Sequence, residues 1–162
     1  MKTIYLAGGC FWCIEYFFLS LKGVISVTSG YSGGQEKETT YEEVKGQKTG
    51  HRETIKVDYD ENIVSLKEIL DEFFLHVDPF DKDGQYIDRG HSYTLAVYYS
   101  SLEEKETIEK RIKEEEKKLK QHIYVSVEPF LFFIKAEENH QGYCLRHPQE
   151  FKEEIDKSGR KL

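Results

Sequence analysis

Apolar side chains recur at helical spacing in three stretches of the chain. Residues 11–21 carry them three and four positions apart, which is typical of a helix with one buried face. Residues 65–77 repeat this spacing after Ser65-Leu-Lys-Glu68, a capping box that favours the start of a helix, and Pro79 favours its end. Residues 101–121 begin in the same way but carry few apolar positions among many charges, so we predict a helix that lies on the surface.

Other stretches alternate between apolar and polar side chains or form short apolar runs, as strands do. We predict strands over residues 3–7, 24–28, 51–59, 92–100, 124–127 and 131–134. Between them we expect a flexible polar loop over 29–34, a single helical turn over 40–44 and a partly helical tail over 139–155. Because strands and helices mix without strict alternation, the predicted fold is α+β, a two-layer sandwich of a mixed β-sheet with packed α-helices. No repeat or linker divides the chain, so residues 1–162 are predicted to form a single domain.

The composition restricts the class of protein. A chain of 162 residues is long enough for one core without disulfide bonds, and its three cysteines form no paired framework. With 33% charged residues and a formal net charge of −7, it shows no basic patch for a nucleic acid. No stretch approaches the roughly 20 apolar residues that span a membrane, and the N-terminal apolar run is too short for a secretion signal. We therefore expect a cytoplasmic monomer with neither membrane nor nucleic acid among its partners.

The hexapeptide Gly8-Gly-Cys-Phe-Trp-Cys13 lies between the first predicted strand and the first predicted helix. Its glycines allow a tight turn, and the first N–H groups of a helix stabilise negative charge. Cys10 is therefore expected to have a lowered pKa and to act as a nucleophile. Cys13 lies about one helical turn further on, close enough for a disulfide, although both cysteines could simply pack as small apolar side chains. A zinc site is the weaker interpretation and we predict no metal; its ligands would be these cysteines with His140, Cys144 and His147.

A carboxyl group in the strand predicted over residues 51–59 shares the core-facing side. Glu53 occupies an odd position of this strand, and the other odd positions are Ile55, Val57 and Tyr59. A carboxyl group in apolar surroundings has a raised pKa and is able to donate a proton at neutral pH. The alternative is a glutamate at the strand end that bends out to solvent or pairs with Arg52 or His51.

Several other side chains carry weaker signals on their own. Tyr41 and Tyr93 are able to donate hydrogen bonds, but tyrosines at the edges of strands and loops usually serve packing. Asp88 lies in a charged loop that contains a glycine, where a turn is the simpler interpretation. Phe11 and Trp12, beside Cys10, either form an apolar wall for a small alkyl group or anchor the helix.

The first five residues of the hexapeptide, Gly8-Gly-Cys-Phe-Trp12, resemble the signature of the A-type peptide methionine sulfoxide reductases. Further blocks of the chain resemble this family in the family's own order. These blocks are Thr40-Tyr41-x-x-Val44 with Gly46 and Thr49-Gly50-His51-x-Glu53; Tyr59-Asp60 with Phe73-Phe74-x-x-His76-x-Asp78-Pro79; Gln85-x-x-Asp88-x-Gly90-x-x-Tyr93; and Ala136-Glu137-x-x-His140-Gln141-x-Tyr143. Because the blocks cover nearly the whole chain, the resemblance is specific.

The resemblance implies that the protein reduces the S epimer of methionine sulfoxide, free or within oxidised proteins, to methionine. Carried over residue by residue, Cys10 attacks the sulfoxide sulfur and becomes a sulfenic acid, while Glu53 protonates the oxygen. A second thiol then forms an intramolecular disulfide, which a thioredoxin-type reductant opens, and no bound cofactor is implied. The remaining implied roles are hydrogen bonding of the oxygen by Tyr41 and Tyr93, support of the site by Asp88, and enclosure of the methyl group by Phe11 and Trp12.

The chain departs from the family pattern in ways that leave the resolving thiol open. Cys13 stands where a glycine often follows Phe-Trp, and Thr94-Leu95 replaces a common Arg-Ser pair. The glycine-rich tail that carries the usual resolving cysteines is absent. Cys13 is the favoured resolving thiol and Cys144 the alternative, while a relay through both, or reduction by an external thiol, also fits the sequence.

Two other functions fit parts of the pattern. A thioredoxin-like dithiol–disulfide oxidoreductase would use Cys10 and Cys13 without needing an acid at Glu53. A non-catalytic module would use its aromatic side chains as a cage for a methylated group and leave Cys10 unreactive. A need for Glu53 in turnover separates the reductase from the first alternative, and rapid alkylation of Cys10 separates it from the second.

Overall fold

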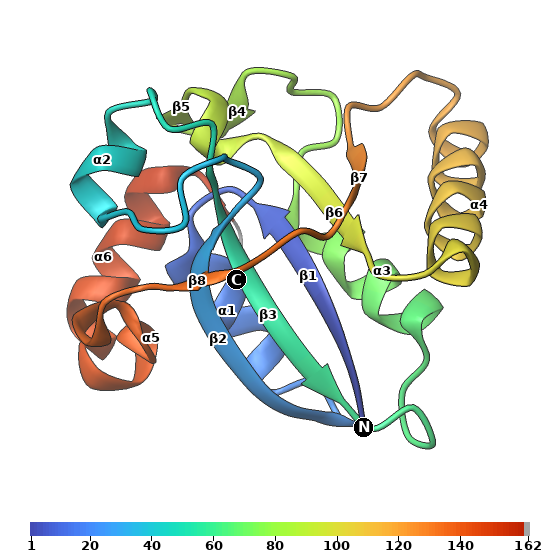
Figure 1. Cartoon of the computed structure of the whole chain (residues 1–162), viewed down its shortest axis with the longest axis horizontal. Coiled ribbons are helices and arrows are strands. Elements are labelled where there is room, and N and C mark those ends of the chain that lie inside the picture. The colour runs from blue at the N-terminus through green and yellow to red at the C-terminus, as the bar shows by residue number, and fades with distance from the viewer. Residues whose placement is uncertain (161–162) are drawn as a thin grey trace.

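A six-stranded mixed sheet forms the centre of the computed structural model, which describes residues 1–160 (Figure 1). The strand order is β7-β6-β1-β3-β2-β8, and every neighbouring pair is antiparallel except β6 and β7. The last two positions of the predicted domain, 161 and 162, lie outside the described residues. The strands are β1 (Lys2–Gly8), β2 (Val24–Ser32), β3 (Arg52–Tyr59), β6 (Leu95–Tyr99), β7 (Ser126–Pro129) and β8 (Ile134–Lys135).

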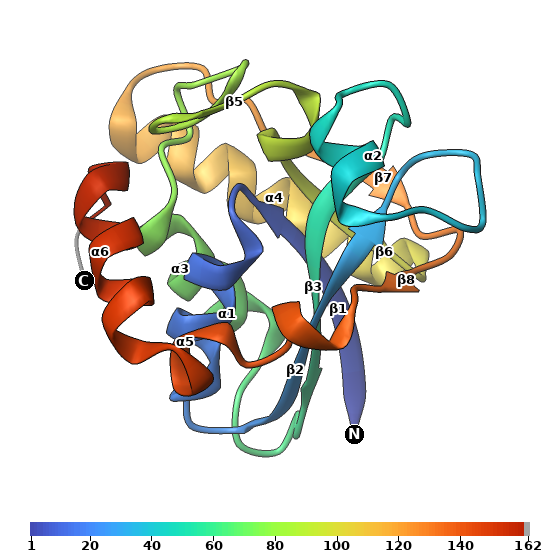
Figure 2. The same ribbon diagram turned by 90° about the vertical axis from the view of Figure 1, so that its left-hand side faces the viewer.

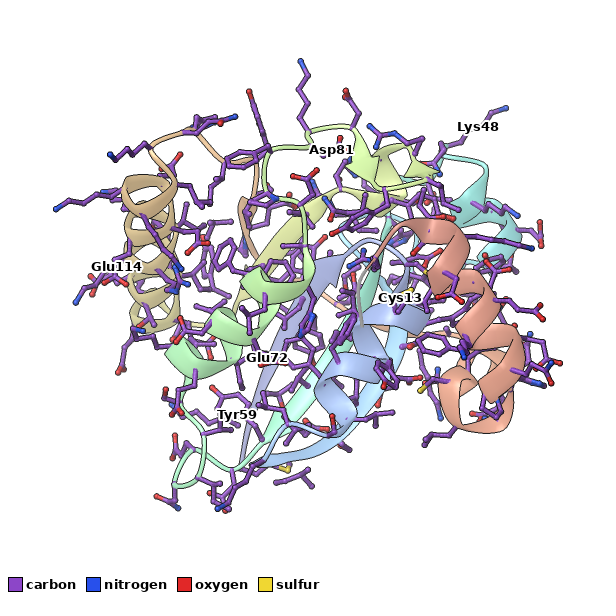
Figure 3. The ribbon with its side chains drawn as sticks, turned by 180° about the vertical axis from the view of Figure 1, so that it is seen from behind. Cys13, Lys48, Tyr59, Glu72, Asp81 and Glu114 are labelled. Atoms are coloured by element: carbon purple, nitrogen blue, oxygen red, sulfur yellow. The ribbon has the colours of Figure 1, made fainter. Side chains whose placement is uncertain are left out.

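Helices cover one face of this sheet, which confirms the predicted α+β architecture. In Figure 1 the helices α1 and α3 lie behind the sheet, and Figure 3 shows them in front when the molecule is seen from behind. Figure 2 shows α5 and α6 beside α1, at the side of the molecule where α1 begins. The helices are α1 (Phe11–Leu19), α2 (Tyr41–Lys45), α3 (Leu66–His76), α4 (Leu102–Leu119), α5 (Tyr143–Arg146) and α6 (Pro148–Ser158).

The core lies between the sheet and the helices α1 and α3. Ile4 of β1 pairs with Val57 of β3, and Leu6 pairs with Ile55, so the alternation of both strands directs these fully buried side chains to one face. The capping box at Ser65 is present in full, since its side chain accepts from Glu68 N–H and Glu68 accepts from Ser65 N–H. This capping box fixes the start of α3 as the sequence predicts.

Three local predictions are wrong. Of the strand predicted over residues 131–134 only Ile134 is in a strand, because β8 is Ile134–Lys135 and residues 131–133 lie in the segment that leads to it. Residues 29–32, predicted as part of a flexible loop, continue β2, because β3 pairs with them on one side and β8 on the other. Tyr93, predicted inside a strand, ends a short 3₁₀ turn over His91–Tyr93, and β6 begins only at Leu95.

The second face of the sheet is also covered. The segment between β7 and β8 crosses it, with the Phe130 ring stacked on Tyr5 at a centroid distance of 3.9 Å (Figure 1). Arg52 and Thr54, on the even side of β3, are therefore buried as well. Within residues 1–160 no helix combines the length and apolar character that crossing a bilayer requires.

Candidate active site

The turn from β1 into α1 presents Cys10 at the N-cap of the helix. Gly9 has a φ of +93°, a left-handed conformation that only glycine adopts at little cost, and Cys10 is non-helical with φ −55° and ψ 118°. The first helical N–H, that of Phe11, donates to Glu53 Oε1 at 3.0 Å. One of the free N–H groups expected near the thiol is therefore already occupied by the carboxyl group of β3.

Gly9→Ala is expected to destabilise the protein and to displace Cys10. A left-handed non-glycine residue costs about 1–2 kcal/mol, and a Cβ at Gly9 would lie 2.6 Å from Arg160 Nη2 and 2.8 Å from Gln85 Cβ. Thermal unfolding and the alkylation rate of Cys10 check both effects. Gly142→Ala is the matched control, because its φ is also positive but nothing lies within 4 Å of its Cβ position. Equal losses in the two variants would show that crowding at Gly9 has no effect.

A cavity of about 240 Å³ opens beside Cys10. Its walls come from α1, α2, β3, α6, the 3₁₀ turn and the β4–β5 hairpin (Gly84–Gln85 and Asp88–Arg89). It brings together most of the residues selected from the sequence; those that line it are Cys10, Trp12, Cys13, Tyr41, Glu53, Asp88 and Tyr93, with Lys45, Ile87, Glu154 and Ser158.

Two residues selected from the sequence do not line this cavity. Phe11 is 1% exposed and packs against Tyr31 and Tyr41, so it supports the wall from behind. Cys144 is buried in α5, away from the cavity lining, and burial raises the pKa of its thiol to about 11.

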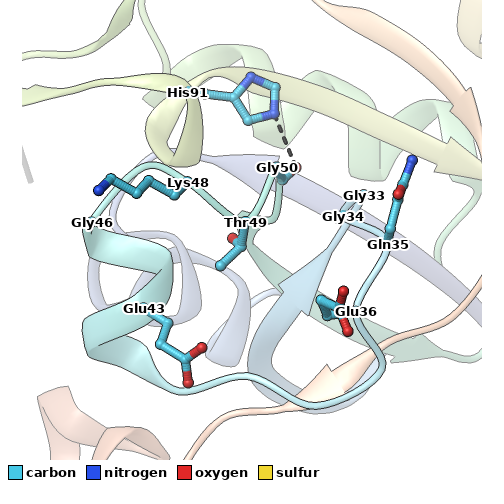
Figure 4. Close-up of a pocket in the computed structure, with 10 residues that line it drawn as sticks. All are labelled: Gly33, Gly34, Gln35, Glu36, Glu43, Gly46, Lys48, Thr49, Gly50 and His91. Carbon is cyan, nitrogen blue, oxygen red and sulfur yellow. Dashed lines mark hydrogen bonds between the residues drawn. The ribbon is translucent and has the colours of Figure 1, made fainter.

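A larger cavity, of about 900 Å³, lies between the loop at 33–36, the loop at 46–50 and His91 (Figure 4). Glycine and polar side chains line it, and His91 Nε2 lies 3.1 Å from the Gly50 carbonyl oxygen. None of the residues selected from the sequence lines it. The chemistry of the chain is therefore concentrated in the smaller cavity.

Glu53 is held in the wall of that cavity, where its neutral form is favoured. Its side chain is 2% exposed, and its pKa is raised well above the ordinary value, first by burial and then by the nearby Cys10. It neither turns out to solvent nor pairs with Arg52, whose Nη1 lies 2.6 Å from Glu128 Oε2 instead. Burial thus favours the proton-bearing form of the Glu53 carboxyl group, which lines the same cavity as the thiol.

The two cysteines share a proton, and the structure places the first negative charge on Cys13. The Cys10 thiol donates to Cys13 Sγ, which raises the pKa of Cys10 well above its usual value, and burial raises it further. The same hydrogen bond lowers the pKa of Cys13. The expected lowering of the Cys10 pKa by the helix N-terminus is therefore wrong. The reason is that the hydrogen bond to Cys13, burial and Asp88 outweigh the effect of the helix N-terminus.

The tyrosines and Asp88 complete the polar side of the cavity. Burial, followed by the nearby Glu53 carboxyl group, raises the pKa of both Tyr41 and Tyr93, so their hydroxyl groups stay protonated and able to donate. Burial also raises the pKa of Asp88. An oxygen atom in this cavity would therefore meet two hydroxyl donors.

Trp12 forms the aromatic side of the cavity and is fixed from the C-terminal segment. Its ring stacks on Tyr143 at 4.0 Å, and its Nε1–H donates to His140 Nδ1 at 3.1 Å. The His140 ring stacks in turn on Tyr41 at 4.4 Å. His140 is thus a hydrogen-bond acceptor for Trp12, and no group of side chains in residues 1–160 is arranged to hold a metal ion.

The Trp12–His140 hydrogen bond predicts that substrate affinity falls at acid pH. The bond needs an unprotonated Nδ1, and burial lowers the His140 pKa from 6.5, so the bond persists to more acid pH than an exposed histidine would allow. Below that lowered pKa we expect KM to rise while the single-turnover rate of the bound substrate changes less. Steady-state kinetics across pH 4–8 check this, with His140→Asn as a control that accepts without titrating. An acid rise in KM that persists in His140→Asn would contradict the role.

Three supporting residues were missed as site residues in the sequence. Glu137 accepts from the Tyr31 hydroxyl at 2.8 Å and from Tyr41 N–H at 2.9 Å, and thereby fixes the start of α2. Buried Glu15 accepts from Gly142 N–H at 3.2 Å and so tethers the segment that carries Tyr143. Arg160 is the third, and it donates to the Gly8 carbonyl oxygen just before the turn. Of the three, only Glu137 had a signal in the sequence, because it lies in a block that resembles the family. Glu15 and Arg160 had no such signal, because only the tertiary structure brings them to the site.

Comparison with known proteins agrees with this geometry. The family model described as peptide methionine sulfoxide reductase matches residues 2–161. The peptide methionine sulfoxide reductase MsrA of Psychrobacter cryohalolentis is 46% identical over 151 residues, which cover 91% of this chain and 85% of that protein. The MsrA of Halalkalibacterium halodurans is 39% identical over 162 residues, with 99% and 92% covered.

Solved structures show the same fold. Reduced Mxr1 from Saccharomyces cerevisiae superposes with a TM-score of 0.87 at 30% identity, covering 91% of this chain and 86% of that one. Mxr1 has also been solved in complex with Trx2. From the extent of the family match and these identities, the chain belongs to the peptide methionine sulfoxide reductase family.

Proposed function

We propose that this protein reduces the S epimer of methionine sulfoxide to methionine in the cavity beside Cys10, whether the substrate is free or part of an oxidised protein. The observation that carries the proposal is the pairing of a thiol with a neutral acid: Glu53, 2% exposed, accepts from Phe11 N–H directly after Cys10. Reduction of a sulfoxide needs both a nucleophile for the sulfur and a proton for the oxygen, which is otherwise a poor leaving group.

In the first step the Cys10 sulfur attacks the sulfoxide sulfur. Cys10 gives its proton across the shared hydrogen bond to Cys13 Sγ, and Glu53 gives its proton to the sulfoxide oxygen. The oxygen is then transferred to Cys10 Sγ: a Cys10 S–O bond forms while the substrate sulfur loses its bonds to the oxygen and to Cys10. Methionine leaves, and Cys10 is left as a sulfenic acid. Tyr41 and Tyr93 donate to the oxygen, and Trp12 packs against the methyl group.

In the second step Cys13 resolves the sulfenic acid. Its sulfur attacks Cys10 Sγ, the Cys10 S–O bond breaks, and the oxygen leaves as water with the Cys13 proton and the proton it already holds. Glu53 is left as a carboxylate and takes a proton from solvent. Because Cys10 is a non-helical N-cap and only Cys13 lies in the helix, a disulfide between them does not require the helix to unwind. Cys144, outside the cavity, takes no part.

A thioredoxin-type dithiol is the reductant that we propose for this disulfide. The complex of the related Mxr1 with Trx2 supports this partner class. Cys10 is partly exposed at the cavity mouth and Cys13 is buried, so an external dithiol is expected to attack Cys10 Sγ first.

The test is turnover of separate epimers. With a dithiol reductant in excess, we expect methionine from the S sulfoxide and none from the R sulfoxide, measured by chromatography of the free amino acid. A peptide containing methionine S-sulfoxide is expected to be reduced as well. Methionine from the R epimer alone, or from neither, would overturn the proposal.

A further inference from the structure

Arg160 lies buried behind the turn that carries Cys10. It follows the end of α6, where its N–H donates to Ser158 Oγ at 3.1 Å, and its side chain is enclosed with the residue only 6% exposed. Its Nη2 donates to the Gly8 carbonyl oxygen at 2.6 Å, one residue before Gly9 and two before Cys10. The guanidinium also stacks over the Tyr86 ring at 4.8 Å.

The charge of Arg160 has no carboxylate partner at ion-pair distance within residues 1–160. Its other acceptor is the His76 carbonyl oxygen at the C-terminal end of α3, where the helix dipole favours a cation. A buried cation whose hydrogen bonds go only to carbonyl oxygens keeps its full positive charge and remains able to stabilise an anion nearby. Figure 3 shows Cys13 in α1, the helix that faces α6.

We propose that Arg160 is a positioning residue that holds negative charge on Cys13 Sγ, and so makes Cys13 the thiol that resolves the Cys10 sulfenic acid. This inference rests on the proposed function. The ordering of the two thiols agrees with it, since the pKa of Cys13 is lowered first by the Cys10 thiol and, among nearby charges, by Arg160.

Arg160 has to act against several acids. The hydrogen bond from the Cys10 thiol favours the Cys13 anion, whereas Asp88 from the β4–β5 hairpin and Glu53 from β3 disfavour it. Lys45 and Glu154 line the cavity further out. Among these groups only Arg160 and Lys45 are positive, and only Arg160 is buried against the turn.

In the resolving step Arg160 itself exchanges no atoms. The Cys13 sulfur supplies the electron pair for the new S–S bond and the Cys10 S–O bond breaks. The oxygen leaves as water with the proton it already holds and the proton that Cys13 gives up on ionising. What Arg160 changes is the fraction of Cys13 present as thiolate. Removal of the charge is expected to reduce this fraction about tenfold near neutral pH, which corresponds to a pKa change of about one unit.

The experiment compares Arg160→Gln with Arg160→Lys, and uses Arg146→Gln, at an exposed position in α5, as the matched control. Each protein is mixed with excess methionine S-sulfoxide without reductant, and methionine, the Cys10–Cys13 disulfide and dimedone-trapped sulfenic acid are followed from pH 6 to 10. Each substitution is also made in a Cys10→Ser/Cys144→Ala background, where Cys13 is the sole thiol and its ionisation is read from ultraviolet thiolate absorbance.

We expect Arg160→Gln to form up to one equivalent of methionine but to close the disulfide about tenfold more slowly near pH 7, to accumulate trapped sulfenic acid, and to recover at higher pH. Arg160→Lys and Arg146→Gln are expected to keep the wild-type profile. If Arg160→Gln only lowers stability and leaves the pH profile and the Cys13 titration unchanged, the inference is overturned. If Arg160→Gln does not fold, a shifted Cys13 titration in Arg160→Lys overturns it. Failure of the proposed function is distinct, because the wild-type protein would then release no methionine.

Discussion

Cys10→Ser is expected to abolish methionine formation, with a loss of roughly 10³-fold or more, because serine is a poor nucleophile and Cys13, the other thiol of the cavity, is buried. The serine keeps the N-cap position and its preference for it, so the fold is expected to persist. The measurement is methionine release from the S sulfoxide with a dithiol reductant present.

Cys144→Ser is the matched control for this prediction. Its thiol is buried in α5, outside the cavity, so turnover is expected to remain near the wild-type level. Wild-type activity in Cys10→Ser, or equal losses in the two variants, would contradict the assignment of the nucleophile.

Glu53→Gln is expected to lower the rate by ~10² to 10⁴-fold at neutral pH, the usual contribution of a general acid. Glutamine still accepts from Phe11 N–H, so the turn before α1 keeps its hydrogen bond while the proton is lost. The raised pKa of Glu53 extends its protonated form to higher pH, so the wild-type rate is expected to fall as pH rises through that raised value. The rate of Glu53→Gln is expected not to fall in this pH range.

Stability and activity are expected to move in opposite directions in this variant. The pKa of Glu53 is raised on folding from 4.5, so its contribution to stability is present below about pH 4.5 and is lost as pH rises toward the folded-state value. Glu53→Gln is therefore expected to gain stability relative to wild type above pH 4.5, measured by denaturant unfolding. A variant that loses activity and stability together would indicate structural damage rather than loss of a proton donor.

The parts of the fold with strong local signals were predictable from the sequence. The capping box at Ser65 and the alternation of residues 51–59 fixed α3 and β3 closely. The extension of β2 through residues 29–32 was not predictable, because it depends on pairing with β8, about a hundred residues further along the chain. Ser29-Gly-Tyr-Ser is locally polar and becomes strand only when both neighbours are in place.

The features of the site also separate into those that local sequence predicted and those that depend on the tertiary structure. The burial of Glu53 followed from the period of β3, and the turn at Gly9 from the hexapeptide. The order of ionisation of Cys10 and Cys13 did not follow, because it depends on the hydrogen bond between the two thiols, on burial and on Arg160, which only the folded chain provides. A helix N-terminus is a local signal, whereas burial is a property of the tertiary structure.

The most direct test of the account is a single turnover without reductant, in which the protein meets excess methionine S-sulfoxide and its thiols are then mapped by mass spectrometry. The account predicts one methionine per protein molecule, a Cys10–Cys13 disulfide and an unmodified Cys144. Methionine without any change at Cys10, a disulfide that joins Cys10 to Cys144, or an unaltered protein with no methionine would contradict it.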